Sequence, residues 1–323
     1  MKYIWRLINI WFWKEITRWT AAAVSKWTPK TSMTFDEKTE KVMDESSLWV
    51  ITTSNAAHQV KEWAEWTIEM NLWVESIALP LLSLMWSVSS TETTWTWAYE
   101  HTFSLVNNNT HQSLTIWIKD PVIDRQFPLS MIESMTISAE VGSFVTVSME
   151  YKSKKWVSWT QTVSYVTDYN LLAKSWIFKI ADNLSWLDAA WSKCIQSFEI
   201  TISKNLEDIY CIWSIEPSDY INKNVTIEWS FVAVYENETD YKNSVFNDDT
   251  KALRLQLVDS NTTIWVSDNP TLTLDLAKTS FTEWEKTMWN DEIITQTLTF
   301  NWMYSLADSS SININLINET ASY

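Results

Sequence analysis

The chain has 323 residues, of which 46% are hydrophobic and 20% charged, and its formal net charge is −16 at pH 7. This length suits one large β domain or two modest ones. The acidic balance argues against a protein that grips nucleic-acid phosphates over a broad surface. An acidic surface can still line a passage through which DNA slides, because repulsion prevents the DNA from sticking.

Glycine is almost absent from this chain, whereas tryptophan is unusually common. The sequence contains one Gly, Gly142, and 24 Trp, although about 7% Gly is usual. Several tryptophans stand where glycine is typical, such as Trp86 directly after an apolar helical run and Trp95 and Trp97 in a turn. Because turns in β proteins need residues that adopt positive φ, we interpret most tryptophans as glycines, encoded by UGA codons that the source reads as Gly. The alternative is a genuine Trp-rich binding surface, which at this density would promote aggregation.

The first residues combine positive charge with apolar side chains, which superficially suggests a secretion signal. The apolar run is short and is interrupted by Arg6 and Asn9, and no small-residue cleavage site follows it. No stretch approaches the length that a helix needs to span a bilayer. The sequence therefore predicts a soluble protein made in the cytoplasm, with residues 1–30 as an extended arm that has little core of its own.

The next part of the chain is predicted to contain two strands separated by polar connections. Residues 31–37 alternate apolar and polar side chains as a strand does, and a charged linker follows to Ser47. The stretch Asp44–Leu72 then opens with an acidic turn, crosses a polar linker and ends in an alternating strand at Thr67–Leu72.

One strong helix and a long series of strands are predicted for the rest. Val74–Met85 is apolar and helical in pattern, and Pro80 inside it is expected to kink or restart the helix. Segments of period two rich in Thr, Val and Ile predict strands. These strands are 98–106, 113–118, 129–138, 144–151, 177–180, 197–203, 226–235, 252–258, 271–276 and 293–300. A short helix is predicted at Thr239–Phe246, and the last fifteen residues are expected to fray or to add an edge strand.

The second half of the chain repeats the plan of the first at a nearly constant spacing. The matched residues are Met33 and Phe198 (165 apart), Trp49 and Trp213 (164 apart), and Trp66 and Trp229 (163 apart). Such offsets favour an internal duplication; the alternative is two all-β domains that resemble each other in composition alone. We therefore predict a first β domain at 31–155, a linker at 156–175 and a second β domain at 176–323.

No residue pattern in the sequence indicates an active site or a metal site. The three histidines, His58, His101 and His111, show no metal-ligand spacing with one another or with Cys194 and Cys211. We predict that His101 lies in a strand, that the other two histidines lie in loops, and that both cysteines are free thiols. No catalytic, cofactor-binding or metal-ligating residue is assigned, and no cofactor is expected.

Two pairs of carboxylates resemble the acid and base of a hydrolase. They are Glu236 with Glu238 and Asp248 with Asp249. Both pairs occur in polar stretches next to Asn and Thr, where solvated surface charge is the ordinary explanation. A hydrolase remains an alternative that requires an acid pair clustered in a cleft, and the sequence by itself predicts a protein that is not an enzyme.

With Trp read as Gly, four stretches become IGFGKEITRGTAAA at 10–23, SMTFDEKTEKVMDESSLGV at 32–50, AEGTIEMNL at 64–72 and IEGSFVAVY at 227–235. In their order and spacing they resemble the tailed-phage tail tube protein family, also called major tail proteins. The resemblance covers most of the chain and implies a mainly β fold, here two tandem β-sandwich or barrel-like tube domains, each with a short helix. It also implies a structural role without catalytic residues.

The resemblance further implies what the protein assembles with. Copies would form rings that stack into a tube, with three duplicated chains closing a pseudo-hexameric ring, or six copies if one half is decoration. The implied partners are tape measure, tail terminator and baseplate or initiator proteins, with DNA passing through the lumen without specific binding and no membrane involved. The location would be the virion tail, assembled in the host cytoplasm. Residues 1–30 and the linker Asp44–Lys61 are expected to cross to adjacent subunits.

One alternative function remains open from the sequence. A Trp-rich carbohydrate-binding or adhesin-like β protein would use genuine tryptophans as platforms on which sugars stack. It requires that the tryptophans be real and exposed.

Overall fold

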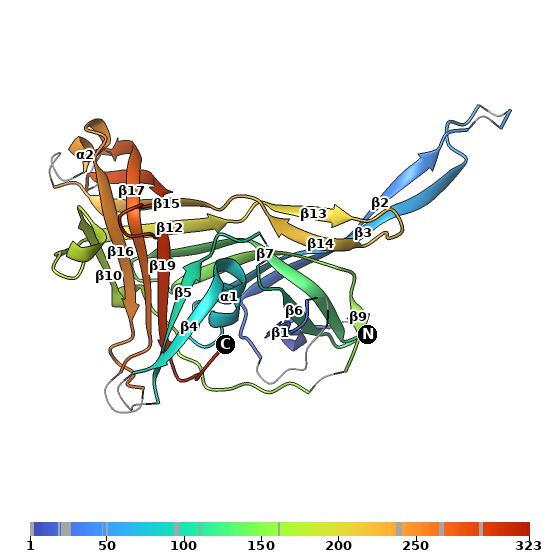
Figure 1. Ribbon diagram of the computed structural model, residues 1–323, viewed down its shortest axis with the longest axis horizontal. Helices are drawn as coiled ribbons and strands as arrows, with labels where there is room; N and C mark the ends of the chain where they lie inside the picture. Colours follow the sequence, from blue (N-terminus) through green and yellow to red (C-terminus); the bar gives the residue numbers. More distant parts are fainter. Residues whose placement is uncertain are drawn as a thin grey trace.

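The computed structural model describes residues 3–18, 20, 27–46, 48–49, 51–93, 97–109, 111–160, 162–236, 241–264, 268–290 and 293–323. Within these residues the fold is mainly β with antiparallel pairing, which confirms the predicted class (Figure 1). The helices are α1 (Ala78–Met85) and α2 (Lys242–Phe246), with 3-10 turns η1 (Trp5–Leu7), η2 (Ala173–Ser175) and η3 (Leu184–Trp186).

The strands follow one another along most of the chain. The first half contains β1 (Asn9–Lys14), β2 (Ser32–Asp44), β3 (Ala56–Asn71), β4 (Trp86–Glu92), β5 (Tyr99–Leu105), β6 (Leu114–Lys119), β7 (Arg125–Glu140), β8 (Thr146–Ser153) and β9 (Val157–Ser158). The second half contains β10 (Trp176–Ala181), β11 (Ser192–Lys193), β12 (Ile195–Ser203), β13 (Leu206–Tyr210), β14 (Pro217–Asn222), β15 (Thr226–Val234), β16 (Thr250–Val258), β17 (Thr271–Thr287), β18 (Thr295–Met303) and β19 (Ile312–Asn318).

Within the described residues the main sheet has 17 strands. Eight of them form a continuous run that organises the molecule, which we call the eight-stranded sheet. Its strands lie in the order β2, β3, β8, β7, β12, β15, β18 and β17. Alternate residues of β3, β8, β12, β15 and β18 are buried over much of their length, because successive side chains of a strand point to opposite faces. Ile68, Ile137 and Ile200 are fully buried on the inner face, where they share one hydrophobic core with the residues of α1. The outer face is left to polar side chains.

The strand pairings of the first half recur in the second. Met33 of β2 lies opposite Ile68 of β3, and Phe198 of β12 lies opposite Phe231 of β15. The two pairs are related by the offsets of 165 and 163 residues that relate the sequence matches. The correspondence extends to the next strand, because Ile68 faces β8 as Phe231 faces β18. We call residues related in this way equivalent.

The long strands β7 and β17 are also equivalent. Both begin in pairings with a strand outside the eight-stranded sheet, β6 for β7 and β16 for β17, and then join the sheet. Against its partner within the sheet, each carries a register shift at the same place, between Ile132 and Ser134 in β7 and between Phe281 and Glu283 in β17. A β-bulge of this kind bends a strand. The two halves thus repeat one plan, while the domain boundaries at 31–155 and 176–323 stay a prediction.

Residues 9–14 are part of the core, so the prediction of an arm without core was wrong for them. They form β1, which pairs antiparallel with β6 and buries Ile10 and Phe12. The run of apolar residues is too short for its periodicity to indicate a strand. Its partner lies about a hundred residues away in the sequence (Phe12 faces Ile116), and local patterns do not reveal such pairings.

Two predicted linkers are strands of one long hairpin. β2 continues to Asp44 and β3 already begins at Ala56, so the charged linker to Ser47 was wrong up to Asp44 and the polar linker Asp44–Lys61 was wrong from Ala56 onward; residues 47 and 50 lie outside the described residues. The hairpin leaves the body of the molecule (Figure 1). Both of its faces therefore meet solvent, and its side chains lack the apolar alternation that identifies a half-buried strand.

Two further differences concern the helix and the end of the chain. The helix begins at Ala78 and not at Val74, which places Pro80 in its first turn, where a missing N–H costs no helical hydrogen bond. The expected edge strand, β19, is paired on both sides, with β17 and with β5. The hairpins containing β4 and β13–β14 were missed; both are formed by mostly polar residues.

A buried carboxylate fastens β1 to its neighbours. Glu15 is 3% exposed and accepts hydrogen bonds from Ser113 Oγ (2.6 Å), Thr115 Oγ1 (2.9 Å) and the Leu129 N–H (2.8 Å). We expect Glu15→Ala to lower the free energy of unfolding by about 2–4 kcal/mol, because it leaves buried donors without an acceptor. Chemical denaturation measures this, with the exposed Glu236→Ala as control within about 0.5 kcal/mol of the parent. Equal midpoints for the two variants would contradict this role.

Candidate assembly surfaces

The outer face of the eight-stranded sheet is polar from one side to the other. Directly opposite residues of neighbouring antiparallel strands point to the same face, so a row of paired residues shows what the face presents. One row runs through Ser32, Glu69, Ser148, Thr136, Thr201, Glu228 and Asn301, and another through Asn71, Thr146, Ser138, Glu199, Ser230, Thr299 and Glu283. We call this surface the polar face. The alternation of apolar and polar residues in a single strand predicts that one of its faces is polar. Only the pairing of neighbouring strands shows that these polar residues form continuous rows.

The charges of the polar face are mainly acidic. The acidic residues at its alternating positions are Asp36, Glu40, Glu65, Glu69, Glu140, Glu150, Glu199, Glu228, Glu283 and Glu285, and the basic ones are Lys38, Lys61, Lys152 and Lys278. Three of these lysines form ion pairs, Lys38 with Asp36 (2.6 Å), Lys61 with Glu40 (2.7 Å) and Lys152 with Glu133 (2.9 Å). The surface therefore repels polyanions while offering hydroxyl and amide groups to water.

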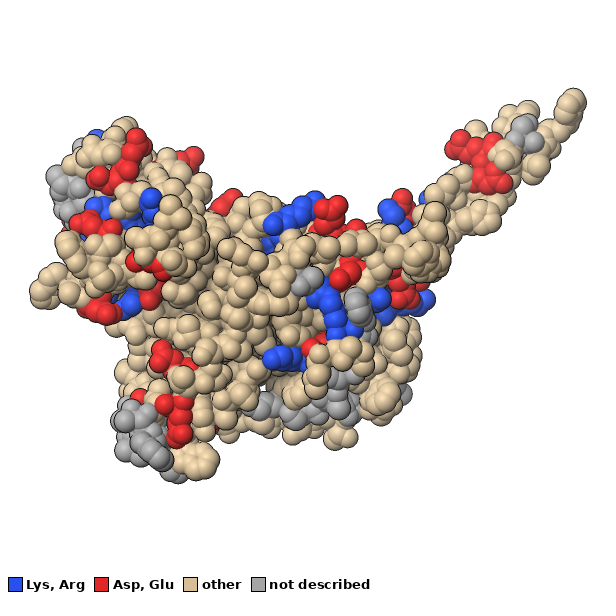
Figure 2. All heavy atoms as spheres, in the orientation of Figure 1, with Lys and Arg blue, Asp and Glu red and all other residues tan. Residues whose placement is uncertain are grey.

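The β2–β3 hairpin forms a second surface. It projects beyond the body (Figure 1), and acidic and basic side chains lie side by side where it leaves (Figure 2). Lys61 of β3 and Glu40 of β2 form an ion pair between its two strands (2.7 Å). Its tip exposes apolar side chains: Leu48 is 64% exposed and Ile51 103%. Exposed apolar side chains gathered at the end of a projection mark a contact surface for another molecule.

The second half has a shorter counterpart of this tip. The hairpin β13–β14 lies between β12 and β15, as the outer hairpin lies between the inner parts of β2 and β3. Ile212 is 100% exposed and Trp213, which is equivalent to Trp49, is 84% exposed. A hydrogen bond from the Glu62 N–H to the Ile215 oxygen (2.8 Å) fastens this loop to β3.

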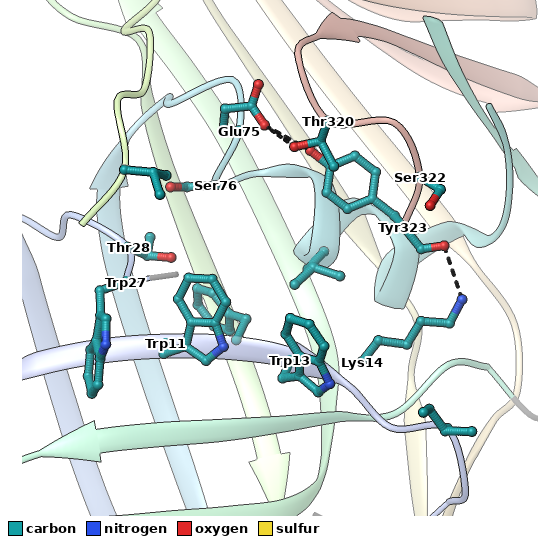
Figure 3. A pocket seen from close by; sticks show the side chains of 14 residues that line it. Trp11, Trp13, Lys14, Trp27, Thr28, Glu75, Ser76, Thr320, Ser322 and Tyr323 are labelled. Atoms are coloured by element: carbon teal, nitrogen blue, oxygen red, sulfur yellow. Dashed lines mark hydrogen bonds between the residues drawn. The ribbon is translucent and has the colours of Figure 1, made fainter. Parts of the chain in front are cut away.

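An apolar pocket of about 300 Å³ lies beside β1 (Figure 3). Trp11 and Trp13 of β1 and Trp27 form one wall, with Tyr323 across from them. Lys14 Nζ donates to the main-chain oxygen of Tyr323 (3.2 Å). Trp11 and Trp27 are 5% and 3% exposed, so little of either indole is open to solvent.

Two carboxylates near this pocket hold segments together. Glu75 accepts hydrogen bonds from the Glu319 N–H (2.9 Å) and from Thr320 Oγ1. Asp168 accepts from the Glu75 N–H (2.8 Å) and from Ser76 Oγ (2.6 Å), and its burial raises the pKa of its carboxyl. These contacts fix the turn before α1 to the end of the chain and to the connection between the halves.

A second group of buried ionisable residues has the same kind of role. Lys204 Nζ donates to the Ser83 oxygen, and burial lowers the pKa of Lys204 well below its ordinary value. Burial also lowers the pKa of His111 to about 3, with a further contribution from the charge of Lys204. Arg18 donates to Asp219 Oδ1 (2.8 Å from Nε). The sequence does not predict this group, because its members come from distant segments.

The residues weighed as catalytic or metal-binding do not form a site. His101 lies in β5 as predicted, with its ring nitrogens 2.8 Å from Ser90 Oγ and 2.9 Å from Asn318 Oδ1. His58 lies in β3 and not in a loop, because the hairpin was mistaken for a linker. Both cysteines are free. Among the carboxylates considered, Glu236, Asp248 and Asp249 are exposed and Glu238 lies outside the described residues. In the described part of the chain, no three His, Cys, Asp or Glu are grouped to hold a metal ion.

These surfaces define a β-sheet protein built for contacts with other protein subunits. The family model described as phage tail tube protein matches residues 28–301, so the chain belongs to the phage tail tube protein family. It is a structural subunit of the tail tube and a component of the virion tail, where it self-assembles into a tube and associates with other tail components. A search of curated proteins found no match. No helix within the described residues is long and apolar enough to cross a membrane.

Proposed function

We propose that three copies of this chain close a pseudo-hexameric ring, and that such rings stack into the tube. The observation that carries the proposal is the arrangement of the eight-stranded sheet. Strands β2, β3, β8 and β7 form one unit, and their equivalents β12, β15, β18 and β17 form the next. A ring of six copies with one half as decoration is disfavoured, because both halves contribute equally to one sheet.

The polar face lines the lumen of this ring. Its acidic residues and hydroxyl groups suit a conduit through which DNA moves, because like charges prevent adhesion and nothing on the face reads bases. The opposite face of the sheet is occupied by the hydrophobic core. With the polar face toward the lumen, DNA passes through the tube without binding to it.

The hairpin tip connects subunits. Its exposed apolar residues become buried against a neighbouring copy in the same ring or in the next ring. The ends of the finished tube meet the tape measure, tail terminator and baseplate or initiator proteins. The residues of β1 stay in their own subunit, since they pair with β6.

The protein acts without catalysis. The buried carboxylates nearest the pocket are engaged by structural donors, and the carboxylate pairs suggested by the sequence are exposed where they are described. The two halves act as domains at 31–155 and 176–323, joined by the linker at 156–175.

We further infer that most of the tryptophans are glycines in the natural protein. Trp49, Trp86 and Trp97 have φ of 64°, 87° and 53°, in a region that favours glycine. Trp86 follows α1 directly and its N–H bonds to the Leu82 oxygen, which is the usual place of a glycine that ends a helix. Among the buried indoles, those of Trp11, Trp117 and Trp229 have no hydrogen-bond acceptor within the described residues.

Electron microscopy tests the ring and the tube together. We expect the purified chain, with the residues that its source encodes, to form stacked rings of three copies when mixed with the tail initiator. Class averages viewed along the tube axis should show three-fold symmetry with six similar lobes. A monomer that persists under these conditions would refute the tube, and a ring of six whole copies would refute the stoichiometry.

A further inference from the structure

The junction between the two halves is itself a strand pairing. β7 of the first half pairs antiparallel with β12 of the second, from Ser134 opposite Ser203 to Glu140 opposite Ser197. Thr136 Oγ1 and Thr201 Oγ1 lie 2.9 Å apart across it, on the polar face. We call this pairing the internal junction. It shows how one four-stranded unit joins the next.

The two outer strands of the eight-stranded sheet are the equivalents of the strands in the internal junction. β2 is equivalent to β12, and among the described residues it pairs with β3 alone. β17 is equivalent to β7, and its residues 283–287 pair with β18 alone in the described chain. Each of these two segments therefore has one edge whose main-chain N–H and C=O groups have no neighbouring strand within the described residues. Such an edge can pair with a strand of another chain.

We propose that β2 of one copy pairs antiparallel with β17 of the next copy in the register of the internal junction. This inference rests on the proposed ring and names the contact that closes it. When each residue of a pair in the internal junction is replaced by its equivalent in β2 or β17, the pairs between copies are obtained. Lys38 then faces Glu283, Asp36 faces Glu285, and Thr34 faces Thr287. The pair of Thr34 and Thr287 corresponds to Glu199 and Ser138 of the internal junction.

Three features of the fold agree with this register. The bulges of β7 and β17 fall at equivalent positions, so both strands present the same edge geometry. α2 packs on β17 as α1 packs on β7, and α1 leaves the edge of β7 open to β12. The free edges also lie at opposite ends of the molecule, with β17 at one end and the β2–β3 hairpin at the other (Figure 1), as a closed ring requires.

The side chains that meet differ in chemistry from those of the internal junction. Lys38, which already contacts Asp36 (2.6 Å), comes to lie opposite Glu283 and diagonal to Glu285. Its ammonium group then lies between the carboxylate of Asp36 in its own copy and those of Glu283 and Glu285 in the next copy, and it reduces the repulsion between them. The internal junction has the two threonines Thr136 and Thr201 where the contact between copies has Asp36 and Glu285. The contact between copies thus depends on one lysine.

Cysteine cross-linking tests the register. In a chain with Cys194→Ser and Cys211→Ser, we expect Thr34→Cys with Thr287→Cys to form disulfides between copies under mild oxidation of assembled tubes. Opposite residues bring their Cβ atoms to about 4.5–5.5 Å, close to the spacing a disulfide needs. Non-reducing electrophoresis should show covalently closed rings. Ser138→Cys with Glu199→Cys is the matched control and should give a disulfide within one chain.

An off-register pair decides between alternative pairings. Thr34→Cys with Glu283→Cys places the cysteines about 14 Å apart along the strands in the proposed register, since each residue advances about 3.4 Å along a strand. Cross-linking of this pair in place of the first would overturn the register. Tubes that form but cross-link in neither variant would overturn the pairing alone. Failure of the cysteine-free parent to form tubes would overturn the proposed function as well.

Charge reversal tests the side chains of the contact. Lys38→Glu places carboxylates of both copies together, and we expect it to abolish tubes while leaving a folded monomer. Adding Glu283→Lys should restore assembly to within about tenfold of the parent's critical concentration, because a cross-strand pair of opposite charge is re-formed. Light scattering measures this concentration, and circular dichroism checks the fold. Assembly by Lys38→Glu alone, or no rescue by the double variant, would contradict the proposed contact.

Discussion

A chain whose hairpin tip, residues 45–55, is replaced by an Asn-Gly turn will remain a folded monomer and will no longer form tubes. The tip contributes little to its own subunit, because Leu48 and Ile51 are 64% and 103% exposed. The Asn-Gly turn suits a two-residue hairpin connection, so β2 and β3 keep their pairing. Burying the tip between copies supplies apolar contact that the shortened hairpin lacks.

The measurements for this variant are tube formation by electron microscopy and thermal unfolding of the monomer. We expect a melting temperature close to that of the parent and a complete loss of tubes. Leu306→Ser is the control, since Leu306 is 87% exposed but lies in the turn between β18 and β19, and this variant should assemble normally. Tubes of normal length from the shortened chain would show that the tip is dispensable.

The protein from virions will have an intact mass well below the 37.9 kDa of the printed sequence. Each Trp that is Gly in the natural chain removes the mass of an indole side chain, and peptide mapping locates each replacement among the 24 positions. The codons at these positions should be UGA. UGG codons at most of them, with the full mass, would contradict the interpretation.

The effect of the replacement on stability is largest where the backbone is left-handed. At Trp86, with φ of 87°, we expect Trp86→Gly to raise the free energy of unfolding by about 1–2 kcal/mol, because an L side chain is strained in this region. Trp63→Gly is the contrasting variant, since position 63 lies inside β3. There glycine should lower stability by about 0.5–1 kcal/mol. Chemical denaturation of both variants gives the comparison.

Much of the fold can be predicted from local patterns in the sequence. The assembly surfaces cannot be predicted in this way. The alternation of Ile200 and Ile202 with polar neighbours predicts β12, and that of Ile227 and Phe231 predicts β15, because half-buried strands have period two. The same rule fails for the hairpin, where Glu40 and Lys61 meet solvent on both faces. It also gives no pairing partners, so the continuous polar face and the free edges of β2 and β17 become visible only in the structure.

The histidines and carboxylates show the same limit at the level of single residues. His101 was correctly placed in a strand, because its neighbours alternate. The buried group of Lys204, His111 and Arg18 was not predicted, since these residues are brought together from distant segments and lack a common motif. Polar residues that serve a core are found through packing and not through spacing in the sequence.

The internal junction changes how a ring can nucleate. In a ring of duplicated chains, half of the joints between four-stranded units form while a single chain folds. These joints do not pay the translational and rotational cost of association, about 4–15 kcal/mol each. Fewer collisions then separate free subunits from a closed ring. Only the other half of the joints forms between molecules. The rate at which free subunits polymerise therefore depends on one type of contact between copies. The joint that contains Thr136 and Thr201 forms when the chain folds and does not affect this rate.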